Sequence, residues 1–166
     1  MRRRLLPALL LCALALGAAI LASSSSPAGS GSFTYRGSVT HVVDGDTVEV
    51  LLRNGRLERI RLIGIDTPER GVCFSQRATV RARQLALGKA VVLRGDVTQA
   101  TRDRHGRLLA YVRLPDGRDL GLELIAGGFG RVYVYRDAFE RLPAYREAET
   151  RARLGLQGQW SACRAA

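Results

Sequence analysis

Short hydrophobic runs separated by polar turns predict a chain built around β-strands. Five segments have this pattern, at residues 33–43, 47–52, 57–65, 90–93 and 108–114. Between the second and third, Arg53-Asn54-Gly55-Arg56 predicts a tight turn, so these two strands form an antiparallel hairpin. If the turn centres on Asn54-Gly55, paired positions sum to about 109, which places Asp46 opposite residue 63 and close to Asp66.

Three later segments have the spacing and end signals of helices. Residues 75–87 are apolar at 78, 82, 85 and 86, residues 119–126 precede two glycines, and a last helix has Pro143 in its first turn and ends at Leu154. Trp160 is expected to pack beyond that helix. This order of elements indicates an α+β domain, best fitted by a five-stranded OB-type β-barrel with three helices, although several α+β folds share it.

The first 32 residues differ in composition from the rest. Residues 2–4 are arginines, residues 5–22 are apolar, and residues 23–32 are Ser, Gly, Ala and Pro. This order predicts a secretion signal cleaved near residues 22–26, with an uncleaved membrane anchor as the alternative because the apolar stretch has an intermediate length. We therefore expect a secreted or extracytoplasmic protein whose folded domain is residues 33–166.

The charge of the chain favours a polyanionic partner. The formal net charge is +11, and without the three N-terminal arginines 23 basic residues still face 15 acidic ones. An arginine-rich composition without functional meaning is the alternative. Lys89 is the only lysine, so nearly all basic groups are guanidiniums, which suit bidentate contact with phosphate.

Two cysteines, Cys73 and Cys163, lie outside the N-terminal segment. An even number in an oxidising compartment predicts a disulfide, and two unpaired thiols are the alternative. His41 and His105 are scattered relative to the cysteines, so a metal site of cysteine and histidine is not expected.

Three aspartates could meet at the open end of the predicted hairpin: Asp44, Asp46 and Asp66. Hard oxygen ligands select calcium, magnesium or manganese over zinc or copper. Such a set fills only part of a coordination sphere and leaves room for water and a substrate phosphate. The alternative for Asp44-Gly45-Asp46 is a plain turn.

Further groups for phosphodiester chemistry follow in the chain. Glu69 leaves a strand after Pro68 and could take a proton from water, or it could be a solvated loop acid. Arg61 and Asp66 are an odd number of residues apart and would face opposite sides of a regular strand, so we predict a bend or bulge near Gly64. Two guanidiniums, Arg61 and Arg107, could stabilise charge that develops on a phosphate.

The motifs together resemble those of the thermonuclease family, the staphylococcal-nuclease-like domains. The matching segments, in the family's order and spacing, are Asp44-Gly45-Asp46-Thr47, Arg61 with Asp66-Thr67-Pro68-Glu69, and Asp103 to Arg107. The resemblance covers roughly residues 34 to 160. It implies an OB-barrel with three helices and a calcium-dependent phosphodiesterase that acts on DNA and RNA and leaves 3′-phosphates.

The same resemblance implies a role for each matching residue. Asp46 and Asp66 would bind Ca2+ through side chains, Thr67 through its carbonyl, and Asp44 through water. Glu69 would be the general base, with Arg61 and Arg107 as phosphate clamps. Substrate contacts would come from four more residues, of which the first two replace a lysine and a tyrosine of the best-known member: Arg104, His105, Tyr133 and Tyr135.

Three functions remain in competition. The first is the calcium-dependent nuclease, expected to be a monomer with no stable protein partner. The second is a non-catalytic OB module that only binds nucleic acid or protein; such modules typically lack the acids and arginines retained here. The third is an extracytoplasmic calcium-binding or envelope protein, whose function would survive mutation of Glu69.

Overall fold

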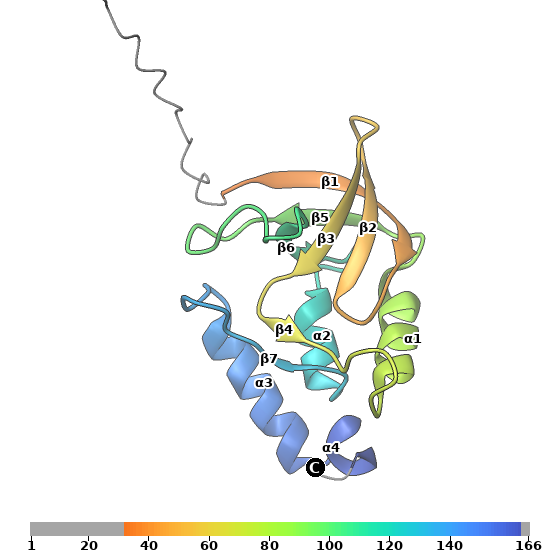
Figure 1. Cartoon of the computed structure of the whole chain (residues 1–166), viewed down its shortest axis with the longest axis vertical. Helices are drawn as coiled ribbons and strands as arrows, with labels where there is room; N and C mark the ends of the chain where they lie inside the picture. Colours follow the sequence, from red (N-terminus) through yellow and green to blue (C-terminus); the bar gives the residue numbers. More distant parts are fainter. Residues whose placement is uncertain (1–31, 164–166) are drawn as a thin grey trace, which may run out of the picture.

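Five strands close into a barrel in the computed structural model of the chain, which describes residues 32–163 (Figure 1). Around the barrel the strands follow the order β1-β2-β3-β6-β5, and they are β1 (Thr34–Val42), β2 (Thr47–Leu52), β3 (Leu57–Leu62), β6 (Leu108–Arg113) and β5 (Ala90–Arg94). β3 pairs with β6 in parallel, whereas the other four pairings are antiparallel. The predicted α+β fold with a five-stranded OB-type barrel is confirmed.

The barrel is filled by alternate residues of each strand, as period-two patterning requires. In β3 and β6 the buried apolar side chains include Ile60, Leu62, Leu108 and Ala110. The intervening positions face out of the barrel, where Tyr111 is nevertheless buried against Tyr145 of the helical part. Arg61, on the outer face of β3, pairs with Leu109 of β6.

The β2–β3 hairpin differs by one residue from the expected register. The Leu52 N–H donates to the Arg56 carbonyl at 2.8 Å, and Gly55 has φ +83°, so three residues form the loop instead of Asn54-Gly55 alone. In the resulting register Thr47 pairs with Arg61, and the Leu62 N–H donates to the Asp46 carbonyl at 2.9 Å. Asp46 thus faces residue 62 and not the predicted residue 63.

The predicted strand 57–65 is interrupted where Gly64 lies. β3 ends at Leu62, Gly64 has φ +78°, and the chain resumes as β4 (Ile65–Asp66). β4 pairs with β7 (Arg131–Val132) in a small separate sheet that the sequence did not predict. The bend expected near Gly64 is therefore present, and it turns the chain out of the barrel towards the helices.

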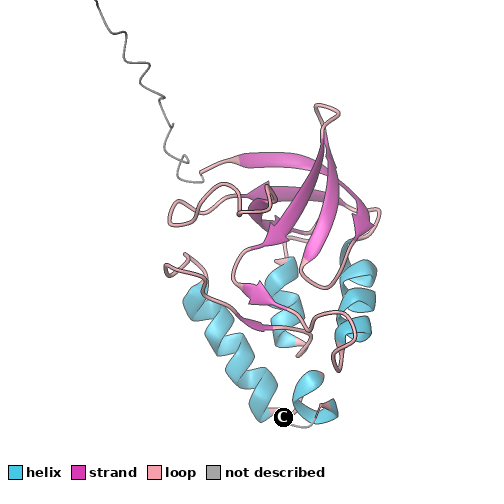
Figure 2. Cartoon of the chain, viewed as in Figure 1, coloured by secondary structure: helices cyan, strands magenta, loops and turns pink. Residues whose placement is uncertain are grey.

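Helices cover one end of the barrel (Figure 2). They are α1 (Ser75–Ala86), α2 (Leu120–Ala126), α3 (Leu142–Leu154) and α4 (Gln159–Ala162). The first three match the predicted helices within one residue. Asp119, predicted as the first residue of the second helix, instead precedes α2 as its N-cap, and its side chain accepts the Leu122 N–H at 3.1 Å. α4 was not predicted because four residues are too short to show a helical period. The guanidinium of Arg153 lies over the ring of Trp160 in α4, with the guanidinium carbon 4.1 Å from the ring centroid.

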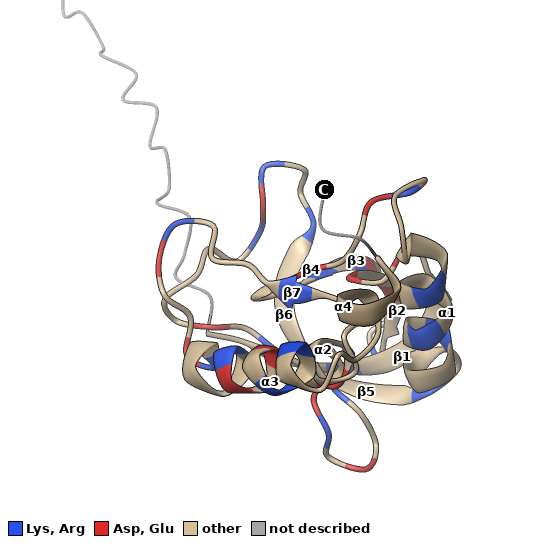
Figure 3. Cartoon of the chain, turned by 90° about the horizontal axis from the view of Figure 1, so that it is seen from below, with Lys and Arg blue, Asp and Glu red and all other residues tan. Residues whose placement is uncertain are grey.

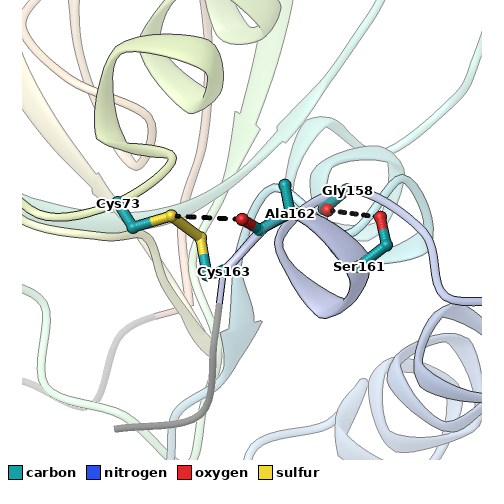
Figure 4. The surroundings of a disulfide bond; sticks show 5 residues. All are labelled: Cys73, Gly158, Ser161, Ala162 and Cys163. Atoms are coloured by element: carbon teal, nitrogen blue, oxygen red, sulfur yellow. Dashed lines mark hydrogen bonds between the residues drawn. A yellow bond between two sulfur atoms is a disulfide. The ribbon is translucent and has the colours of Figure 1, made fainter.

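A disulfide joins Cys73, in the segment before α1, to Cys163 after α4 (Figure 4). α4 is itself tied to the end of α2, because the Gln159 N–H donates to the Gly128 carbonyl at 2.9 Å. Gly158 permits this close approach: a Cβ there would lie 2.4 Å from the Gly128 oxygen. The loop that precedes α1 is thereby fastened to the helical end of the molecule.

The expected signal or anchor over residues 1–32 lies outside the described residues, apart from Ser32 at its end. Among residues 32–163, no helix combines the length and the apolar character needed to cross a membrane.

Candidate active site

Asp46, the residue just before β2, is the buried centre of the site. Asp46 is only 6% exposed. Its Oδ2 accepts hydrogen bonds from the Thr67 N–H at 2.8 Å and from Thr67 Oγ1 at 3.0 Å, and its Oδ1 accepts one from Thr47 Oγ1 at 3.2 Å. Asp44 shapes the loop by accepting the Asp46 N–H at 3.1 Å. Gly45 lets this loop approach closely, since a Cβ there would lie 2.7 Å from Thr67 Oγ1. The first and second motifs are therefore packed together.

Arg61 connects the two carboxylates that the sequence singled out. Its Nε lies 3.2 Å from Asp46 Oδ1, and its Nη2 lies 3.6 Å from Asp66 Oδ1. Its Nη1 donates to the carbonyls of Leu62 and Ile65 at 3.0 and 2.7 Å, on either side of the bend. The bend at 63–64 thus brings Arg61 and Asp66 to the same side and is held by the guanidinium itself.

Arg131 is a site residue that the sequence analysis missed. It is the partner of Asp66 in the β4–β7 pair, and it donates from Nε and Nη2 to Asp66 Oδ2 at 3.0 and 2.8 Å. A two-residue strand has no periodicity to detect. The only available signal was the alternation in Arg131-Val132-Tyr133-Val134-Tyr135, which fits an extended segment.

The site suits a hard divalent cation. Burial raises the pKa of Asp46 above its usual range; Arg61 opposes this shift, while the nearby Asp44 carboxylate adds to it. Positive charge beside Asp46 would relieve the cost of burying its carboxylate. Within residues 32–163, no three His, Cys, Asp or Glu side chains gather to hold an ion by themselves. Asp46 and Asp66 would need help from a backbone carbonyl, water or substrate, as oxygen-coordinated ions commonly do.

Glu69 lies in the irregular segment between β4 and α1. It is exposed, and in the described part of the chain its carboxylate makes neither an ion pair nor a hydrogen bond. Its carbonyl accepts the Val72 N–H at 2.9 Å, and the segment is fastened at Cys73 by the disulfide. The structure does not bring Glu69 into contact with Asp46 or Arg61, and the carboxylate has no partner in the described part of the chain.

Arg107 precedes β6 and is positioned by Asp103. Its Nε donates to Asp103 Oδ2 at 2.6 Å, and its backbone N–H donates to Oδ1 at 3.0 Å. Burial by itself would raise the pKa of Asp103, but hydrogen bonds from Arg107 and from the His105 N–H outweigh it, so the pKa lies below its usual range. Asp103 therefore stays ionised and fixes the guanidinium.

Arg61 belongs to β3, and Arg107 is the residue immediately before the neighbouring strand β6. In the parallel β3–β6 pair, Arg61 is the partner of Leu109, and Arg107 is two residues before Leu109. Paired residues and residues two apart point to the same side of a sheet. This alternation places Arg107 on the same side of the sheet as Arg61, and no direct contact joins the two guanidiniums among the described residues.

The four residues expected to contact substrate lie on exposed segments around this centre. Arg104 and His105 are on the loop before β6, where Arg104 Nε donates to the His105 ring at 3.0 Å. Tyr133 and Tyr135 are 44% and 63% exposed, with ring centroids 6.5 Å apart. The Tyr133 N–H donates to the Gly64 carbonyl at 3.0 Å, which places this segment beside the bend. Neither ring belongs to the core.

The family profile described as "Staphylococcal nuclease homologue" matches residues 59–162 of the chain. This range covers more than half of the sequence and includes Arg61, Asp66, Glu69 and Arg107. The chain belongs to the staphylococcal nuclease family. The family match, together with relatives that are named nucleases, identifies the protein as a nuclease, a hydrolase of phosphodiester bonds.

Similar proteins agree with this assignment. The staphylococcal nuclease homologue is 32% identical to a "Micrococcal nuclease" of Shigella flexneri over 157 residues, covering 89% of this chain and 84% of the relative. It is 35% identical to an "Uncharacterized endonuclease" of Escherichia coli over 125 residues, covering 75% and 76%. It is 32% identical to "Endonuclease YncB" of Bacillus subtilis over 126 residues, covering 72% and 58%.

In this staphylococcal nuclease homologue, three segments converge on one buried carboxylate. The 44–46 loop, the end of β3 and the β4 segment meet through Asp46, Arg61, Asp66 and Thr67. Glu69, Arg107 and the exposed tyrosines make no hydrogen bond or ion pair with Asp46 or Arg61 among the described residues, and Tyr133 is tied to the bend through the Gly64 carbonyl.

Proposed function

We propose that this nuclease is calcium-dependent, works outside the cytoplasm, and cuts both DNA and RNA to leave 3′-phosphates. One observation carries the proposal: Arg61 lies between the carboxylates of Asp46 and Asp66, with Thr67 fastened to Asp46. This combination unites oxygen ligands for a hard cation with a guanidinium for phosphate. A module that only bound nucleic acid would not need to bury a carboxylate at such cost.

Asp46 and Asp66 would hold Ca2+ through their side chains, with the Thr67 carbonyl as a further ligand and Asp44 acting through water. Bound calcium supplies a positive charge beside the phosphate and a place for the attacking water. A cation held by the two carboxylates would weaken their attraction for Arg61. Its Nε and Nη2 would then be available to a phosphate, while Nη1 donates to the Leu62 and Ile65 carbonyls.

Glu69 is assigned as the general base because its carboxylate is exposed and has no partner in the described chain. It accepts the proton of the water that attacks phosphorus, and the bond from phosphorus to the 5′-oxygen breaks, with that oxygen taking a proton from solvent to become the 5′-hydroxyl. Arg61 and Arg107 stabilise the charge that builds up on the phosphate oxygens. Asp103 positions Arg107 for this role through two hydrogen bonds.

Two features support a location outside the cytoplasm. Residues 2–32 have the composition of an export segment. Cys73 and Cys163 form a disulfide, a bond that persists chiefly in oxidising compartments.

The first experiment is digestion of plasmid, single-stranded DNA and RNA by residues 27–166 in calcium, magnesium or chelator. Wild type is compared with Glu69→Gln and Arg107→Ala. The matched controls are Glu147→Gln and Arg151→Ala, an exposed ion pair on α3. Both site variants should lose about a hundredfold or more in rate, since groups that stabilise transition-state charge contribute on that scale. Both controls should cut like wild type.

Each alternative predicts a different result. If wild type binds DNA in every metal but never cuts it, the protein is a binding module. If it cuts equally well in chelator, the calcium assignment is wrong. End-group analysis of the products checks the 3′-phosphate, because a 5′-phosphate would place bond cleavage on the other side of phosphorus.

A further inference from the structure

A second basic surface adjoins the active site on the side of α1. A pocket of about 750 Å³ lies between the 43–44 loop, the 68–74 segment and α1. Three arginines line it, Arg70, Arg77 and Arg83. It adjoins the active site, since Asp44 lines the pocket and also accepts the Asp46 N–H, and Pro68 of the lining follows Thr67 directly.

The three guanidiniums have no carboxylate partner within residues 32–163. Arg77 lies over the Phe74 ring at 5.3 Å, and Arg83 makes one long hydrogen bond of 3.5 Å to the Val42 carbonyl. Arginines elsewhere, such as those at positions 59, 94 and 118, are neutralised by nearby glutamates or aspartates. Positive charge at this pocket is therefore available to a ligand.

The pocket has few negative groups of its own. Asp44 is the one carboxylate among its lining residues, and α1 carries arginines but no acid, seen as blue bands without red in Figure 3. Gln76 also lines the pocket and adds an amide donor. Guanidinium and amide N–H groups are common contacts for phosphate oxygens.

We propose that this pocket binds phosphates of the substrate strand that flank the bond being cut. The inference rests on the proposed function and extends its substrate site. Arg77 and Arg83 are six residues apart on α1, or about 9 Å along the helix axis, a span that covers two or three phosphates of a stacked strand. Asp44 joins the two sites, because it lines the pocket and holds the loop that carries Asp46.

The test is binding of a fluorescent, phosphorothioate-linked single-stranded DNA octanucleotide in chelator, so that no cleavage intervenes. The variant is Arg70→Gln/Arg77→Gln/Arg83→Gln. The control removes the same number of guanidiniums from a pocket of about 670 Å³ at the far end of the barrel, lined by Arg36, Arg53 and Arg113. Those three also lack carboxylate partners among the described residues. β2 alone separates the two ends by about 17 Å, at the usual rise per strand residue.

The pocket variant should bind roughly tenfold more weakly, and its log Kd against log salt slope should flatten by about 2, the value for three lost phosphate contacts on a single strand. The control should match wild type. Equal weakening in both triple variants would show general charge attraction, and no weakening in either would show that the pocket touches no DNA. Each result overturns the proposal.

Because Arg70 follows Glu69 directly, a change at Arg70 could disturb Glu69, so the double variant Arg77→Gln/Arg83→Gln is measured as well. It removes two of the three guanidiniums and should show about two-thirds of the change in salt slope seen in the triple variant. In calcium, the ratio of kcat/KM on an octanucleotide to that on a dinucleotide should fall in both pocket variants. Wild type that binds with the arginine-dependent slope but never cuts would refute the proposed function and leave the pocket intact. Wild-type cutting with the same octanucleotide-to-dinucleotide ratio of kcat/KM in all variants would refute the pocket proposal and leave the proposed function standing.

Discussion

Gly64→Ala should destabilise the protein and disturb the active site together. Two separate penalties arise from the structure. Gly64 has φ +78°, and an added Cβ would lie 2.3 Å from the Phe139 ring. Phe139 is buried and packs edge-on against Tyr145 with centroids 5.4 Å apart, so the ring has little room to move.

The two penalties can be separated with Gly55→Ala. Gly55 has a similar φ of +83°, but nothing lies within 4 Å of its Cβ position. Left-handed backbone costs an alanine about 1–2 kcal/mol, and overpacking a core costs about 1–3 kcal/mol more. We therefore expect Gly55→Ala to lose about 1–2 kcal/mol of unfolding free energy, and Gly64→Ala about 2–5 kcal/mol.

Urea unfolding followed by circular dichroism measures both losses. Gly64→Ala should also lower kcat, because the bend it distorts carries the Leu62 and Ile65 carbonyls that hold Arg61. Gly55→Ala, at the hairpin tip, should leave kcat unchanged. Equal destabilisation by the two variants would refute the steric argument. Unchanged kcat in a folded Gly64→Ala protein would refute the claim that the bend positions Arg61.

Three further predictions concern the rest of the molecule. Asp96→Asn should cost about 2 kcal/mol at pH 7, since asparagine has one acceptor oxygen where Asp96 has two: if that oxygen accepts from Thr98, the NH2 group cannot accept the Glu140 N–H (2.7 Å in the structure). Burial by itself would raise the pKa of Asp96, but hydrogen bonds to its carboxylate outweigh burial and lower the pKa in the folded state. The ionised Asp96 therefore stabilises the fold fully above about pH 4 and progressively less as pH falls further. Urea unfolding should accordingly show the difference in unfolding free energy between wild type and Asp96→Asn becoming smaller below that pH. Cys73→Ser/Cys163→Ser should lower the thermal midpoint, with a loss of about 2–4 kcal/mol, and a reductant should then have no further effect. Tyr135→Leu should weaken oligonucleotide binding about tenfold, measured by fluorescence anisotropy, if its ring stacks on a base.

The barrel could be predicted because its strands carry their own evidence. Hydrophobic alternation located all five barrel strands, and the odd spacing of Arg61 and Asp66 located the bend at Gly64. The register failed by one residue because Asn-Gly turns occur in loops of two or three residues, and only the hydrogen bond between Leu52 and Arg56 distinguishes them.

The site was less completely accessible to sequence reasoning. The convergence of Asp46 and Asp66 followed from the hairpin and the bend, which are local. Arg131 could not be predicted as a partner of Asp66, because that pairing joins residues 65 apart through strands of two residues each. Asp103, within the third motif, had no expected role until its hydrogen bonds to Arg107 were seen.

The disulfide has a consequence for the lifetime of the protein among proteases. Cys73 and Cys163 are 90 residues apart and enclose most of the described chain, including the exposed loops at 102–106 and 133–137. A single cut in either loop leaves two fragments that remain covalently joined and can stay packed around the same core. The nicked protein would migrate as one band on a non-reducing gel and as two after reduction. A nuclease exposed to proteases would in this way tolerate a first cleavage without losing a part of itself.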